Sequence, residues 1–223
     1  MVKILLPILV LFLSSCFTNR QTFYKSEKAR YPDGKVFTFP LYDLNSQLDD
    51  QDDPILELIN RNVSRETALI FGSIAVNRET FTTSIQKSPL KNHYPNFLKE
   101  IGFSIGQNSN LPPEIIPALK EFSKEIGVEM VLFPFISGNF FDMKQGEELR
   151  LTILLYDSQT GEFQYSANLE GIKIPGVILE ANLNDEEKIL SESIKLIEIE
   201  LKKFLKQLKK DLVEWKTLSG NSW

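Results

Sequence analysis

The sequence predicts an α+β fold: a small mixed sheet with a C-terminal antiparallel meander, packed by helices that include a long C-terminal helix. Two observations support this prediction. Three apolar segments of strand length follow one another between residues 128 and 169, and segment 185–215 repeats apolar side chains at helical spacing. The chain has 223 residues, which is enough for one domain with a sizeable buried core.

The first 16 residues have the layout of a secretory signal. One lysine precedes an apolar run over residues 4–13, and two serines then precede Cys16. The run is too short for a transmembrane helix, which needs about 20 apolar residues. Residues 13–16 (LSSC) resemble the bacterial lipobox, in which the cysteine thiol receives a diacylglycerol, the signal is cleaved before it, and the new amino group is acylated.

This resemblance implies a lipoprotein signal peptide over residues 1–15 and lipidation at Cys16, with palmitate as a typical acyl chain. A conventional signal peptide, or an apolar N-terminal helix with an incidental cysteine, is the alternative. The lipid would be the protein's contact with the membrane, because each buried acyl CH₂ contributes about 0.8 kcal/mol.

The composition excludes several classes of site. The formal net charge is −5, and it becomes −6 once Lys3 leaves with the signal, so nothing favours a nucleic-acid partner. A single cysteine excludes an internal disulfide and the cysteine-rich zinc sites, and a single histidine excludes sites with two or three histidine ligands. We therefore expect no metal and no cofactor.

The mature chain divides into a tether, one domain and a tail. Residues 16–34 are polar and lack helical or strand periodicity, which predicts a tether between the lipid and the domain. A single α+β domain is expected over 35–215, and a tail over 216–223. The domain opens with a strand over 35–42, and Asp53 followed by Pro54 marks the start of a helix.

The middle of the domain combines a predicted hairpin with two predicted helices. Residues 66–77 are rich in β-branched and apolar side chains, which predicts a strand, and residues 81–86 are its expected hairpin partner. Helices are predicted over 94–105 and from about residue 112 to 126. Gly127 is placed to end the second helix.

The predicted meander follows. Segment 128–137 is almost continuously apolar, as in a strand covered on both faces, and Pro134 requires an edge or a bulge because it cannot donate to a ladder. A second strand over 149–156 leads into a turn, 157–161, whose glycine can adopt a positive φ. Segment 162–169 then alternates apolar and polar residues, which predicts the third strand.

The last element is a helix over 185–215. Its apolar residues fall at alternating steps of four and three: Leu190, Ile194, Ile197, Leu201, Phe204 and Leu208. Such a stripe favours packing against the domain's own sheet. A coiled-coil partner helix is the alternative, since heptad spacing extends over about three heptads.

No catalytic residue is predicted. Residues 102–106 match the GxSxG pattern of a nucleophile elbow, which requires a strand before its serine. Here an amphipathic helix is expected before Ser104, and the only histidine, His93, precedes that serine instead of following it. The sequence therefore favours a protein that is not an enzyme.

Three segments resemble a superfamily of envelope proteins. They are its opening strand (35–43), a helix that runs into a strand (119–138), and a hairpin with Asp157, Thr160 and Gly161 at the turn (149–166). The superfamily includes the curli-secretion lipoprotein, the amino-terminal domain of the Tol-system propeller protein, and lipoprotein activators of penicillin-binding proteins. The resemblance implies an α+β sandwich that binds proteins or assembles, with no shared catalytic residues.

The functional expectation is a non-enzymatic, lipid-anchored envelope protein. It would bind another envelope protein or self-associate, with the 185–215 helix as one candidate surface. Phe17 after the cysteine, in place of an aspartate, favours the outer membrane over the inner one. The alternative is a surface-exposed lipoprotein that binds an external ligand or host molecule, and the domain could face the periplasm or the cell surface.

Overall fold

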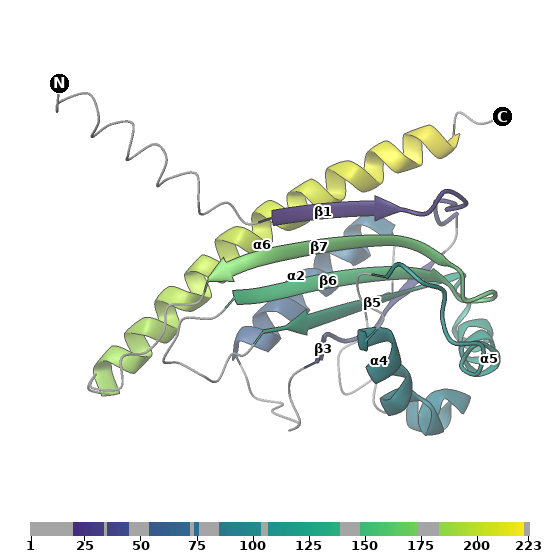
Figure 1. Ribbon diagram of the computed structural model, residues 1–223, viewed down its shortest axis with the longest axis horizontal. Coiled ribbons are helices and arrows are strands. Elements are labelled where there is room, and N and C mark those ends of the chain that lie inside the picture. The colour runs from purple at the N-terminus through teal and green to yellow at the C-terminus, as the bar shows by residue number, and fades with distance from the viewer. Residues whose placement is uncertain are drawn as a thin grey trace.

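Seven strands form one mixed sheet in the computed structural model, which describes residues 20–33, 35–44, 54–71, 74–75, 85–103, 107–138, 148–173 and 183–220. The strand order is β1-β7-β6-β5-β2-β4, and β3 pairs with β5 beside this path. The predicted α+β class is confirmed, with the long C-terminal helix lying across one face of the sheet (Figure 1).

The C-terminal meander is confirmed. Strands β5 (Met130–Ser137), β6 (Glu148–Asp157) and β7 (Phe163–Lys173) pair antiparallel in sequence order. Every residue of β5 except the last is buried, as expected for a strand with helices on both faces.

Pro134 lies opposite a break in the neighbouring strand. Strands β2 (Val36–Thr38) and β3 (Tyr42–Asp43) both run parallel to β5, and the chain leaves the sheet between them. Leu132 and Ile136 each accept a backbone hydrogen bond of 2.9 Å on this side of β5, from Phe39 and Leu44. Pro134 lies midway, so the position without an N–H faces the gap between β2 and β3.

The expectation of an unpaired tether over 16–34 is wrong for residues 20–25. Strand β1 (Arg20–Lys25) pairs antiparallel with β7, from Arg20 opposite Glu170 to Lys25 opposite Tyr165. Phe23 stacks on Phe204 of the C-terminal helix with ring centroids 5.9 Å apart. The sequence pattern does not predict this strand, because β1 lies at the edge of the sheet and places only one large apolar side chain, that of Phe23, against the core.

The expectation of a strand over 66–77 is wrong for residues 66–71. Helix α2 (Pro54–Phe71) begins at the predicted proline but continues through this segment. Among the described residues of this segment, Ile74 and Ala75 are extended as β4 (Ile74–Ala75), which pairs parallel with β2. Of the expected partner strand over 81–86, Ile85 and Gln86 are helical and the rest lies outside the described residues.

Two apolar cores lie on opposite faces of the sheet. Helices α2 and α6 (Leu183–Gly220) cover one face, while α4 (Tyr94–Phe103), the 3₁₀ turn η2 (Pro89–Asn92) and α5 (Ile116–Ile126) cover the other (Figure 1). Gly127 ends α5 with φ +69°, as predicted. Helix α6 runs to Gly220, so the expected tail over 216–223 is wrong for residues 216–220.

Candidate functional site

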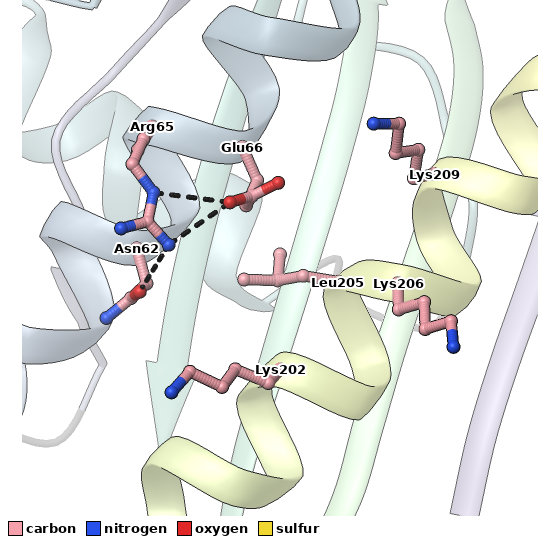
Figure 2. A pocket seen from close by; sticks show the side chains of 7 residues that line it. All are labelled: Asn62, Arg65, Glu66, Lys202, Leu205, Lys206 and Lys209. Atoms are coloured by element: carbon pink, nitrogen blue, oxygen red, sulfur yellow. Dashed lines mark hydrogen bonds and ion pairs between the residues drawn. The ribbon is translucent and has the colours of Figure 1, made fainter.

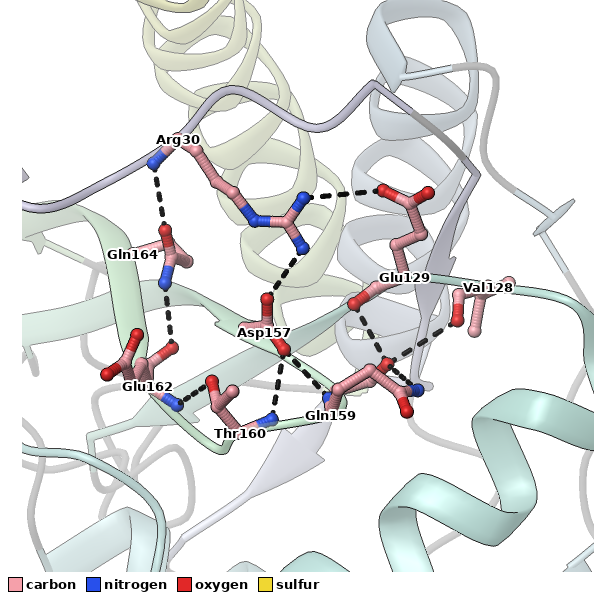
Figure 3. Close-up of polar contacts among 9 residues, drawn as sticks. Arg30, Val128, Glu129, Asp157, Gln159, Thr160, Glu162 and Gln164 are labelled. Carbon is pink, nitrogen blue, oxygen red and sulfur yellow. Dashed lines mark hydrogen bonds and ion pairs between the residues drawn. The ribbon is translucent and has the colours of Figure 1, made fainter.

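The N-terminal segment is fastened to the β6–β7 turn by an ion pair. The Arg30 guanidinium donates from Nη2 to Oδ2 of Asp157 at 2.7 Å, and its Nη1 lies 3.7 Å from Glu129 (Figure 3). The Asp157 side chain is 7% exposed and that of Arg30 is 51% exposed. The backbone N–H of Arg30 also donates to the Gln164 side chain at 3.0 Å, so residues after β1 are held against the sheet.

The same aspartate organises the turn that follows it. Its Oδ1 accepts hydrogen bonds from the backbone N–H groups of Gln159 (2.8 Å) and Thr160 (3.0 Å) (Figure 3). Gly161 closes the turn with φ +72° and donates to the Asp157 carbonyl at 2.9 Å. The side chains of the D-x-x-T-G pattern therefore have a structural role.

Electrostatics at this turn favour ionised Asp157. Burial alone would raise the pKa of the carboxyl, but the hydrogen bonds from Arg30 and from the two turn amides outweigh burial, so the pKa is lowered. The ion pair in turn raises the pKa of Arg30. The pair remains charged at neutral pH, which suits a structural clasp better than proton transfer.

The C-terminal half of α6 docks through an aromatic cluster. Trp215 stacks on Tyr165 of β7 with centroids 5.6 Å apart and meets the edge of Tyr31 at 5.4 Å. The Tyr165 hydroxyl donates to Asp211 at 2.8 Å. Burial first, and then the nearby Asp211 carboxylate, raise the pKa of Tyr165, so it stays a hydrogen-bond donor at physiological pH.

The apolar stripe of α6 belongs to the domain's own core. Ile197, Leu201, Phe204 and Leu208 are buried in it, Ile194 is partly buried against it, and the Leu190 side chain is not among those described. The prediction of packing on the sheet is confirmed. A partner of this helix would have to use its outer face instead of the heptad stripe.

A partly open basic groove lies between α2 and α6. It measures about 200 Å³ and is lined by Asn62, Arg65, Glu66, Lys202, Leu205, Lys206 and Lys209 (Figure 2). Arg65 pairs with Glu66 at 3.1 Å, and Lys202 pairs with Glu198 at 2.8 Å. Small-molecule pockets usually hold about 300–1,000 Å³ and enclose the ligand, so the groove suits a surface contact better than a buried substrate.

Helix α2 contributes to the charge beside the groove. The pKa of Glu198 is lowered, chiefly by its hydrogen bond from Lys202 and further by the charges of Arg61 and Arg65. Cations from both helices therefore converge on this side of the molecule, although the chain as a whole is acidic.

Of Cys16, His93 and Ser104, the residues considered for chemistry, the structure describes His93 alone. Cys16 and Ser104 lie outside the described residues, and α4 occupies the positions directly before Ser104, where an elbow needs a strand. His93 is exposed at the end of η2. Across the described part of the chain, no group of three or more His, Cys, Asp or Glu side chains could hold a metal ion.

No helix in the described ranges is both long and apolar enough to cross a bilayer.

Comparisons with known proteins show only distant likeness. No protein-family model matches the chain, and no curated protein matches it. Among solved structures, the LpoB C-terminal domain from Salmonella enterica is 16% identical, with 64% of this chain and 85% of that chain covered and a TM-score of 0.36.

Two further solved structures are similar at the same level. The PelC dodecamer from Paraburkholderia phytofirmans is 9% identical, covering 81% of this chain and 92% of that chain with a TM-score of 0.36. Lipoprotein GNA1162 from Neisseria meningitidis is 12% identical, covering 73% and 95% with a TM-score of 0.36. Likeness at this level does not establish a shared function.

Proposed function

We propose that this protein is a non-enzymatic lipoprotein of the bacterial envelope whose folded domain binds another envelope protein or a second copy of itself. The observation that carries the proposal is the lipobox-like segment ending at Cys16, four positions before the first residue of β1. A lipid on Cys16 would hold the sheet beside one membrane. Confinement of this kind raises the effective concentration of the domain for partners on that membrane.

The ion pair at Asp157 and the aromatic contacts of Trp215 hold the fold together. The groove between α2 and α6 is only partly enclosed. Phe17 after the cysteine favours the outer membrane as the site of the anchor.

Metabolic labelling tests the anchor. Wild-type protein and Ser15→Ala, which keeps a small residue before the cysteine, should incorporate an alkyne-tagged palmitate and partition into detergent. Cys16→Ala should do neither. Labelling of Cys16→Ala to the wild-type level would overturn the proposal.

Cross-linking on membranes tests the binding role. A cross-linked species that contains a second envelope protein, or two copies of this chain, should form with wild-type protein and weaken in Cys16→Ala. Protease treatment of intact cells then separates this role from its alternative. Resistance supports a periplasmic domain, whereas cleavage supports a surface-exposed domain that binds an external ligand or host molecule.

A further inference from the structure

We infer that the outer face of α6 lies on the anionic headgroups of the same bilayer that holds the lipid of Cys16; this inference rests on the proposed lipid anchor. The outer face is a stripe of residues three or four positions apart, directed away from the sheet: Lys195, Ile199, Lys203, Lys206, Lys210 and Val213. Ile199 is 50% exposed and Val213 is 53% exposed, although both are large apolar residues.

Positive charge is concentrated in the middle of this stripe. The segment from Lys202 to Lys210 contains five lysines and no acidic residue. Lys203 pairs with Glu200 at 2.6 Å, and Lys202 with Glu198. Within the described part of the chain no ion pair is formed by the other three lysines of the segment, so their charge is available to an external anion.

The course of β1 brings the anchor to this helix. Phe23 stacks on Phe204, and the Lys25 ammonium lies 5.9 Å from the ring centroid of Trp215, so β1 runs along α6 in the same direction (Figure 1). Four steps of extended chain separate Cys16 from Arg20, and they span at most about 14 Å. The acyl chains would therefore enter the bilayer within about 14 Å of the start of β1, beside α6.

The chemistry of the stripe fits a lipid surface. Lysine side chains can lay their methylene stems on apolar surface while the ammonium reaches phosphate groups. Exposed Ile199 and Val213 flank the lysines, as apolar residues do on helices that lie in the plane of an interface. The groove beside the stripe adds Lys209, which lines it together with Lys206 of the stripe (Figure 2).

Site-directed fluorescence on the lipidated protein tests the orientation. The full-length chain is expressed with its own signal, purified in detergent and reconstituted into vesicles of phosphatidylcholine, with or without phosphatidylglycerol. Lipidation blocks the single native thiol, so Ile199→Cys can be labelled alone with an environment-sensitive dye. Glu121→Cys, on the exposed side of α5 over the opposite face of the sheet, is the matched control.

The expected result is quenching of the dye at position 199 by a lipid-borne quencher in the anionic vesicles, with little quenching at position 121. Lys206→Gln/Lys210→Gln should lower the ratio of membrane-facing to free orientations by about fivefold for each lysine removed. The control variant Lys120→Gln/Lys124→Gln removes two lysines at the same spacing from the exposed side of α5. It should leave the ratio unchanged.

The outcomes separate the two proposals. A reactive Cys16 thiol, or failure of the protein to float with vesicles, overturns the lipid anchor. Normal flotation with position 199 in water, or with equal quenching in neutral and anionic vesicles, overturns only the orientation. If the dye at position 199 is shielded from water in detergent without vesicles, the membrane orientation is also overturned, because another protein chain then covers the stripe.

Discussion

The Arg30 guanidinium and the Asp157 carboxylate meet at 2.7 Å although they lie 127 positions apart in the chain. One residue follows the first strand and the other ends β6. Their contact fixes the segment between β1 and β2 across the top of the β6–β7 turn (Figure 3). The folded domain therefore begins before residue 35, and the first residue of β1 is only four positions after the proposed lipidation site, Cys16.

Asp157→Asn should lower the free energy of unfolding at pH 7 by about 2 kcal/mol, because Arg30 loses the nearer of its two charged partners and keeps only Glu129 at 3.7 Å. The folded pKa of Asp157 is lowered, so its contribution is complete above the unfolded value of about 4 and is lost as the pH falls through the folded pKa. The difference between variant and wild type should therefore shrink below about pH 4. Urea titrations at several pH values measure it.

Arg61→Ala provides the control for that experiment, since it removes an exposed arginine from α2 and should change stability by less than about 0.5 kcal/mol. A stability difference for Asp157→Asn that stays constant from neutral pH to well below pH 4 would argue against the ion pair.

Two glycines with the same backbone conformation should respond differently to alanine. Gly127 has φ +69° and open space where a Cβ would lie, so Gly127→Ala should cost about 1 kcal/mol from backbone strain. Gly161 has φ +72°, but a Cβ there would lie 2.8 Å from the Ile116 side chain. Gly161→Ala should therefore cost about 3 kcal/mol. Equal midpoints in thermal unfolding would contradict this packing of the turn on α5.

The aromatic cluster at the C-terminal half of α6 should be essential for docking the helix. Trp215→Ala should lower the free energy of unfolding by about 4 kcal/mol, because it removes a buried ring stacked on Tyr165. Tyr165→Phe keeps the stacking and loses only the hydrogen bond to Asp211, so a loss of about 1 kcal/mol is expected. Chemical denaturation compares them, and similar losses would mean that the stacking contributes little.

Phe23→Ala tests whether β1 belongs to the fold. Its ring is partly buried against Phe204, and truncation should cost about 2 kcal/mol. Lys28→Ala, at an exposed position after the strand, should leave stability unchanged. Amide hydrogen exchange provides a second readout, since the β1 amides paired with β7 should be protected. Unprotected β1 amides in the wild-type protein would instead support the prediction that residues 20–25 are part of a tether.

The sequence predicted the elements whose pattern is strong and local. The meander was recognisable because its third strand alternates cleanly and its turn carries Asp157 and Gly161. The long helix was recognisable because its apolar residues recur every three or four positions up to Leu208. Gly127 and Pro54 marked helix ends through backbone conformation, which depends on the residue type itself.

Two of the wrong predictions, the strand over 66–71 and the tether over 20–25, concern elements that depend on partners distant in the chain. Residues 66–71 have strand-like composition, yet Ile55, Ile59, Val63 and Thr67 recur every fourth position and pack α2 on the sheet, which keeps the segment helical. That four-residue spacing was the signal available. Strand β1 offered almost none, since its backbone pairs with an edge that only the folded meander provides.

The lipobox-like segment at Cys16 was visible in the sequence because it is a contiguous pattern, and it remains the basis of the proposed anchor. Only the tertiary structure decided that β1 runs beside α6 and that the apolar stripe of α6 faces inward, which leaves the lysines on its outer face. A sequence pattern shows which residues share a face of one helix. Contacts between segments far apart in the chain determine which face of the helix is covered and what lies beside its exposed face.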